Sequence, residues 1–172
     1  RSTPIKSSAA SDVYKRQLED SKKNLYTDNC ILNSVLNIKY SAAQVADIKI
    51  ESNIFVPKYM NIDYGDMGVL FGNLLDNAIE ANQGVDRKKR WINVSVKYEE
   101  HILIINIKNS KIRGSRRKKK GYLNHGIGLN SVKQIVEKFN GIVEVQDFGE
   151  MYEVSAILYG ICDDKDLGKS VL

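Results

Sequence analysis

The helical pattern that most constrains this 172-residue chain reads Leu70-Phe71-Gly72-Asn73-Leu74-Leu75-Asp76-Asn77-Ala78-Ile79-Glu80-Ala81-Asn82. Its apolar residues recur at helical spacing and form one stripe. Asn73 and Asn77 are four residues apart, so they lie one above the other at the border of that stripe. Asn is a poor helix former, so two of them carry a small local cost. Spacing alone leaves two interpretations open, which are tolerated surface amides and amides directed into a cleft.

The length and composition indicate one globular domain, with or without tails, that can bury a sizeable core. The hydrophobic fraction of 42% is ordinary for a globular protein. No apolar run approaches the ~20 residues that span a bilayer, and the N-terminus lacks the apolar core of a signal peptide. Cys30 and Cys162 form no C-x-x-C pair, which fits a reducing compartment and predicts neither a disulfide framework nor a zinc site.

The net charge of +5 comes from one segment, residues 111–120, which carries seven positive charges and no acid. Without that segment the chain has 19 basic and 21 acidic residues, a net charge of −2. The basicity is therefore local, and we expect no nucleic acid as the partner, because a dedicated nucleic-acid binder has a broad basic face.

Around the opening helix, the sequence predicts a cap at each end. Asp63 is the expected N-cap, with Asp66 in the first turn, and Gly84 is the expected C-terminal stop. A charged, helical lead-in is expected over Leu18–Leu25. A second helical pattern runs from Asp28 to Ala46.

The remaining segments predict strands and one further helix. Residues 48–52 alternate as a strand that Pro57 ends. Residues 92–98 and 102–107 predict an antiparallel hairpin, and a connection of about 16 residues, 110–125, follows it. A helix from about Gly126 to Phe139 ends at Asn140-Gly141. A second hairpin is expected from residues 142–147 and 152–158 across Phe148-Gly149-Glu150. The predicted fold class is α+β, a two-layer α/β sandwich with about three helices on one face of a mixed, mostly antiparallel sheet of about five strands.

Three features follow one another along the chain: the Asn73–Asn77 pair, Asn109 after a buried strand, and Gly126-Ile127-Gly128-Leu129 at the start of a helix. In this order the chain resembles the ATP-binding domain of the GHKL (gyrase, Hsp90, histidine kinase, MutL) superfamily, over roughly residues 24–159. Residues 73–81 are similar to its N-box and residues 125–133 to its second glycine box. The sequence is most similar to the AgrC-type quorum-sensing sensor histidine kinases. The resemblance implies a Bergerat-type ATP-binding fold.

The resemblance also implies cofactors, ATP and Mg²⁺. Mg²⁺ is a hard ion that takes one or two protein oxygens plus phosphate oxygens, and the amide of Asn77 is the implied ligand. Asn73 is the implied catalytic residue and stands where gyrase-like members carry a water-activating Glu. An amide is no general base at neutral pH, which favours phosphoryl transfer over hydrolysis, with Asn73 positioning metal or water.

The remaining nucleotide contacts are expected in the glycine box, at Asn109 and in the basic segment. Glycines let a backbone approach phosphate closely, and a helix N-terminus favours negative charge. Asn109 replaces the Asp of the usual Asp-x-Gly-x-Gly box and could read adenine as an amide does in DNA; it could also simply end a strand. The resulting phosphate and nucleotide candidates are Lys120 (with Lys119 beside it), His125, Gly126, Ile127, Gly128 and Leu129.

Residues 111–120 are interpreted as an ATP lid or as a solvated loop. His101 is expected to be a simple turn residue. No His precedes position 101, so the phosphoacceptor helices of the family are expected to lie outside this chain. We expect residues 1–17 to be a disordered flank foreign to the fold, 18–40 a helical lead-in from the dimerisation region, 41–160 the catalytic domain, and 161–172 a tail.

The function implied by the resemblance is the ATP-binding catalytic domain of a bacterial two-component sensor histidine kinase. Its expected partners are a phosphoacceptor His domain and a response regulator, with homodimerisation only in the full-length kinase. The expected location is cytoplasmic, with membrane attachment only through segments missing here. Two alternatives stay open: a stand-alone kinase of the anti-sigma-factor type that phosphorylates Ser, and a non-catalytic binding module that uses residues 111–120 in a salt-sensitive manner.

Overall fold

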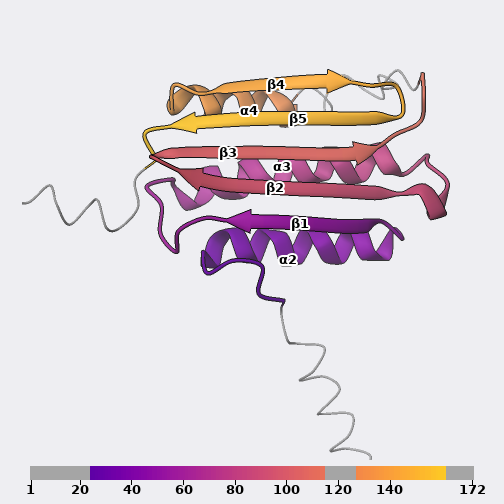
Figure 1. Ribbon diagram of the computed structural model, residues 1–172, viewed down its shortest axis with the longest axis horizontal. Coiled ribbons are helices and arrows are strands. Elements are labelled where there is room, and N and C mark those ends of the chain that lie inside the picture. Colours follow the sequence, from indigo (N-terminus) through magenta and orange to yellow (C-terminus); the bar gives the residue numbers. More distant parts are fainter. Residues whose placement is uncertain (1–23, 115–126, 162–172) are drawn as a thin grey trace, which may run out of the picture.

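Helix α3 (Tyr64–Asn82) is the central element of the helical layer and contains the sequence that predicted it. A computed structural model describes residues 24–114 and 127–161. In it, α2 (Cys30–Val45) and α4 (Ile127–Lys138) pack on either side of α3. All three helices cover the same face of one sheet (Figure 1).

The sheet has five strands, β1 (Lys49–Phe55), β2 (Trp91–Glu99), β3 (Ile102–Ser110), β4 (Ile142–Asp147) and β5 (Met151–Tyr159). Their order is β1-β2-β3-β5-β4, with β1 parallel to β2 and every other pair antiparallel. The fold class predicted from the sequence, a two-layer sandwich with a mixed and mostly antiparallel sheet, is confirmed.

The core lies between the sheet and the helices because strand residues alternate between the two faces. β2 and β3 direct their aliphatic residues to the helices, and those residues are almost fully buried: Ile92, Val94, Val96, Leu103, Ile105 and Ile107. The apolar stripe of α3 covers them. Burying each such side chain contributes roughly 1.5–3 kcal/mol to the free energy of folding. The packing of the α3 stripe against the sheet is therefore a major stabilising contribution.

Asp63 caps α3 as predicted, and its carboxylate accepts hydrogen bonds from the N–H groups of Gly65 (2.7 Å) and Asp66 (3.3 Å). The prediction for the other end was wrong in mechanism. The helix ends at Asn82, and Gly84 does not adopt the left-handed conformation of a capping glycine. A Cβ on Gly84 would instead collide with Cδ1 of Ile112, so this glycine allows the chain after β3 to approach α3.

The N-terminal part differs from the expected helical lead-in. Asn24 and Leu25 are not helical, and the rest of that lead-in lies outside the described residues. The backbone N–H of Tyr26 donates to the side chain of Asn33 (2.9 Å), a contact that replaces helical hydrogen bonding. α2 runs unbroken through residue 40, and its Leu32 and Leu36 belong to the same core as α3.

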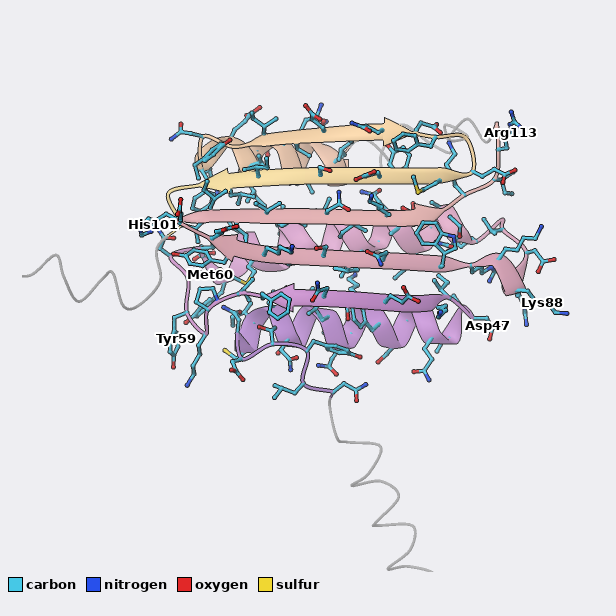
Figure 2. The ribbon with its side chains drawn as sticks, in the orientation of Figure 1. Asp47, Tyr59, Met60, Lys88, His101 and Arg113 are labelled. Carbon is cyan, nitrogen blue, oxygen red and sulfur yellow. The ribbon has the colours of Figure 1, made fainter. Side chains whose placement is uncertain are left out.

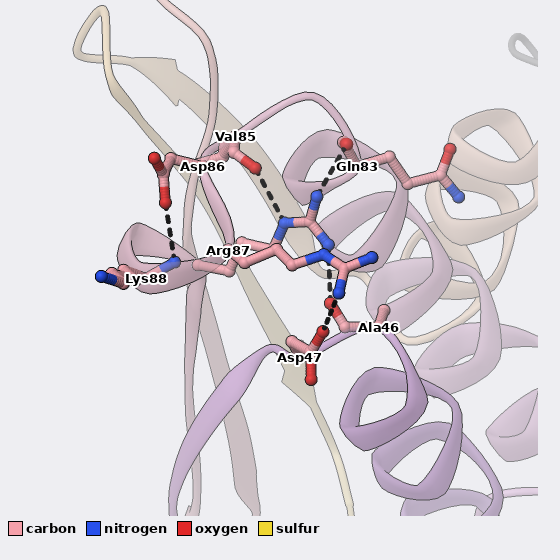
Figure 3. A network of polar contacts seen from close by, with 8 residues as sticks. Ala46, Asp47, Gln83, Val85, Asp86, Arg87 and Lys88 are labelled. Atoms are coloured by element: carbon pink, nitrogen blue, oxygen red, sulfur yellow. Dashed lines mark hydrogen bonds and ion pairs between the residues drawn. The ribbon is translucent and has the colours of Figure 1, made fainter.

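Arg90 joins the C-terminal ends of α2 and α3, and its partners Ala46, Gln83 and Val85 are labelled in Figure 3. Its nitrogens donate to the backbone carbonyls of Ala46 (2.7 Å), Val85 (2.8 Å) and Gln83 (3.1 Å). Carbonyls near a helix C-terminus lack partners within the helix and carry partial negative charge, so a cation stabilises them. The Arg87–Asp47 ion pair (3.2 Å) lies beside this network.

Candidate functional site

α3 and α4 run antiparallel, and two contacts fix how they align. Lys138 at the end of α4 pairs with Asp66 in the first turn of α3 (3.0 Å). At the opposite end, Gly128 near the start of α4 lies against Asn73 in the middle of α3. The N-terminus of α4 is therefore directed to the half of α3 that carries both predicted amides.

Gly128 is a glycine because Asn73 occupies the space beside it. A Cβ on Gly128 would lie 3.0 Å from Oδ1 and 3.4 Å from Cγ of Asn73, tighter than nearly all real Cβ contacts. Asn77 lies one turn further along α3, and both amides are half-buried rather than free on the surface. Asn73 thus lies at the contact between α3 and the first turn of α4, and the interpretation of Asn73 and Asn77 as amides directed into a cleft stays a prediction.

Asn109 is part of β3 and not a residue that follows the strand. It alternates with Ile105 and Ile107, so it lies on the face that the helices cover, and it is only 2% exposed. Its Nδ2 donates to the carbonyl oxygen of Ser110 (2.9 Å). Within residues 24–114 and 127–161, no donor reaches its Oδ1. An amide oxygen that accepts from no described donor, on a residue that is otherwise buried, is available to a hydrogen-bond donor of a ligand.

A buried polar junction ties the ends of α3, β2 and β3 together, and the sequence analysis missed it. Oδ1 of Asn82 accepts from Ser110 Oγ (2.5 Å) and from the backbone N–H of Trp91 (3.2 Å). Its Nδ2 donates to the carbonyl oxygens of Ala78 (2.9 Å) and Trp91 (3.3 Å). The available signal was the position of Asn82, four residues after Ala78 on the buried stripe.

Lys111 is committed to the β4–β5 hairpin, although it opens the basic segment. Its ammonium contacts Asp147 Oδ2 at 2.5 Å and lies 5.8 Å from the ring centroid of Tyr152, and its side chain is 9% exposed. The hydrogen bond from Lys111, with a second from the N–H of Gly149, lowers the pKa of the Asp147 carboxyl. Lys111 is therefore held away from a role as a mobile phosphate ligand.

The other predicted contacts are only partly described. Lys119, Lys120, His125 and Gly126 lie outside the described residues. Ile127 is the first residue of α4, and Leu129 is half-buried against the core.

His101 occupies the β2–β3 turn, as expected. Glu100 and His101 both have positive φ (46° and 65°), the pattern of a two-residue type I′ hairpin turn. Figure 2 places His101 at the opposite end of the sheet from Arg113, which follows β3. His101 is therefore remote from Asn109, which lies near the end of β3.

The amide oxygens of Asn73 and Asn77 fit a hard metal ion bound together with a nucleotide. Asn73 and Asn77 supply neutral amide oxygens, which suit Mg²⁺ but bind it weakly without a second anionic ligand. Within 24–114 and 127–161, no three His, Cys, Asp or Glu residues gather as a metal site of their own. A metal ion held by these two amides would need phosphate oxygens as further ligands. In the same part of the chain, no helix is long and apolar enough to cross a membrane.

Comparison with known proteins agrees with this arrangement. A family model described as the GHKL domain matches residues 62–158, more than half of the chain. A curated protein of Bacillus subtilis (strain 168), described as a probable C4-dicarboxylate sensor kinase, is 32% identical over 95 residues. The match covers 49% of this chain and only 18% of that relative.

Similar solved structures include several histidine kinase domains. The catalytic domain of the histidine kinase ThkA has a TM-score of 0.60 at 15% identity, with 77% of this chain and 91% of that chain covered. The mycobacterial sensor histidine kinase MprB has a TM-score of 0.57 at 20% identity, with 76% and 93% covered. Full-length ShkA, solved with AMPPNP, has a TM-score of 0.60 at 14% identity, with 81% and 32% covered. At these identities the likeness establishes the fold.

Proposed function

Because the chain belongs to the GHKL family, we propose that it is the ATP-binding catalytic domain of a bacterial two-component sensor histidine kinase. The observation that carries the proposal is the approach of α4 to Asn73, with the amide of Asn109 on the same, helix-covered side of the sheet. The N-terminus of α4 approaches Asn73, and the covered end of β3 presents Oδ1 of Asn109, which accepts from no donor in the described part of the chain. These are the polar groups that a nucleotide needs at its phosphate and base ends.

The roles of the residues follow from their chemistry. Asn77 and Asn73 would hold Mg²⁺ through amide oxygens, and that ion would neutralise charge on the β- and γ-phosphates when bound. Gly128 and the first turn of α4 would approach the phosphates through backbone N–H groups. Asn109 would accept a hydrogen bond from the adenine amino group.

The direction of the chemistry rests on what Asn73 cannot do. Hydrolysis needs a base that removes a proton from water, and a carboxamide does not accept one at neutral pH. Asn73 is oriented by its contact with Gly128 and can position the metal or a water molecule. The bound γ-phosphate would therefore be transferred to a protein acceptor rather than to water.

The acceptor in this proposal is a histidine on a separate phosphoacceptor domain, and a response regulator would receive the phosphoryl group next. The domain would act on the cytoplasmic side of a sensor kinase that dimerises as a whole. The AgrC-type, quorum-sensing assignment stays a prediction, because the curated relative with a matching sequence is described as a C4-dicarboxylate sensor kinase.

Titration with a fluorescent ATP analogue tests the metal assignment. Asn77→Ala removes the amide oxygen proposed as the metal ligand, so the affinity for Mg-ATP should fall at least tenfold while the affinity for metal-free ATP changes little. Asn53→Ala, an exposed Asn of β1 on the open face of the sheet, is the matched control. If Asn77→Ala binds Mg-ATP as the wild type does, the assignment of this residue is wrong.

A further inference from the structure

The buried junction between α3 and the end of β3 lies next to the proposed base-binding group. Asn82 is 0% exposed and Ser110 is 5% exposed. Each of the four polar contacts of Asn82 reaches a different group on α3, β2 or β3. Ser110 Oγ also accepts from the N–H of Trp91 (3.1 Å), so the hydroxyl is both donor and acceptor within the junction.

Ser110 links this junction to Asn109. The Nδ2 group of Asn109 donates to Ser110 O at 2.9 Å, so the amide nitrogen is turned to its own strand. Its Oδ1 is then turned the other way and meets no donor among the described residues. Without the junction, the amide could rotate and present its N–H₂ group instead, because the two ends of a carboxamide have nearly the same shape.

We propose that Asn82 and Ser110 are positioning residues that hold the Asn109 amide with its oxygen towards the ligand and thereby make this site select 6-aminopurine nucleotides. This inference rests on the proposed function. A hydrogen-bond acceptor at this position pairs with the exocyclic amino group of adenine and opposes the 6-carbonyl of guanine. The selectivity is thus determined by two residues that need not touch the nucleotide.

The alternative is that the junction only stabilises the fold. Affinity for ATP alone would not separate the two ideas, because a loosened fold also binds more weakly. The ratio of affinities for two purines does separate them, because a general loss of stability weakens both ligands equally. The ligands of choice are ATP, GTP and purine riboside triphosphate, which has hydrogen in place of the 6-amino group.

The variants Ser110→Thr and Ser110→Val have nearly the same shape and differ by the hydroxyl. Both residue types suit a strand. Ser110→Thr should keep the wild-type preference for ATP over purine riboside triphosphate. Ser110→Val should reduce that preference about three- to tenfold, the worth of one neutral hydrogen bond. Ser110→Ala removes the hydroxyl without added volume and should behave like Ser110→Val if the larger variants do not fold.

The open face of the sheet offers a matched control. Asn106 donates to Ser155 Oγ at 2.8 Å, another Asn–Ser pair, on the face that no helix covers in the described part of the chain. Ser155→Val and Ser155→Thr should leave the purine preference unchanged. The fluorescence of Trp91, the one tryptophan of the chain, reports binding and thermal unfolding in every variant.

The outcomes separate the two proposals. If the wild type binds none of the three nucleotides, the proposed function is wrong. If the wild type prefers ATP and both Ser110→Val and Ser110→Ala keep the wild-type preference, the nucleotide site stands and the positioning role is wrong. Loss of preference in Ser110→Val and Ser110→Ala, with retention in Ser110→Thr and the Ser155 variants, supports it.

Discussion

The two ends of the sheet are held together by different forces. At the end where β3 finishes, side chains bind backbone groups, as Arg90 does on α2 and α3 and Asn82 does on β2. At the end with the Glu100–His101 turn, Leu158 and Ile161 are fully buried, and the hydrogen bond from Tyr98 Oη to the carbonyl oxygen of Ile161 (3.2 Å) is only partly buried. Buried hydrogen bonds are directional, so they can fix the position of a side chain, as those of Asn82 and Ser110 do at the end of β3. The proposed adenine-binding residue Asn109 lies at the end where β3 finishes.

Arg90→Met should give the largest loss of stability among the variants that compare the two ends. The variant keeps much of the aliphatic stem but leaves three backbone carbonyls without their cationic donor, so the free energy of unfolding should fall by about 2–3 kcal/mol. Lys138→Met, which breaks the exposed pair with Asp66 at the other end, should cost about 0.5 kcal/mol or less. Urea unfolding followed by Trp91 fluorescence measures both. Equal losses would contradict the claim that the two ends differ.

Tyr40 tests whether an unpartnered polar atom always indicates a ligand. Its hydroxyl is buried without a hydrogen-bond partner in the described part of the chain, and burial raises its pKa to about 12. Neighbouring Ser52 lowers the pKa, but burial dominates. Tyr40 lies on α2, whereas Asn109 lies on β3.

For Tyr40 the expected pH dependence has a definite sign. The folded pKa lies above the unfolded value of about 10, so the stabilisation of the neutral phenol is complete below pH 10 and is lost between about pH 10 and 12. Two pKa units correspond to roughly 2–3 kcal/mol at the upper limit. Tyr40→Phe should match the wild type at pH 7 and be more stable above pH 11 in urea unfolding. Parallel curves at all pH values would contradict the burial of this hydroxyl.

Replacing two helical glycines by Ala should change the stability by smaller amounts, and the two changes should differ in sign. A Cβ added to Gly68 in α3 would meet no atom within 4 Å, so Gly68→Ala should gain about 0.8–1 kcal/mol of helix propensity. Gly128→Ala should lose that gain against Asn73 Oδ1 at 3.0 Å and should also bind Mg-ATP several-fold more weakly. Thermal unfolding and nucleotide titration of the two variants give the comparison. A Gly128→Ala protein as stable as Gly68→Ala and with normal affinity would show that the contact with Asn73 is unimportant.

Local rules predicted the elements, and long-range contacts limited the prediction of the site. The N-cap at Asp63 and the stripe of α3 depend on residues a few positions apart, so the sequence was sufficient for them. The partner of Asn82 is Ser110, 28 residues away, and only the register of β3 against β2 brings the two together. Gly84 was misinterpreted for the same reason, because Ile112 approaches it from a distant segment.

The site itself shows the same limit. The sequence placed Asn73 and Asn77 on the correct helix and Asn109 just beyond a strand that in fact includes it, and nothing in it gave the direction of the Asn109 amide. The charge count could not tell that Lys111 belongs to the β4–β5 hairpin, because Asp147 lies 36 residues further along. The roles of Lys120, His125 and Gly126 stay predictions.

Arg90 has a consequence for the order in which the molecule opens. Arg90 directly precedes β2 in the chain, and its guanidinium donates to carbonyls at the ends of two helices. Fraying of either helix end therefore breaks hydrogen bonds to the same guanidinium. Segments joined in this way exchange their amide hydrogens as one cooperative unit. The C-terminal end of α3 therefore shares its local stability with the end of α2.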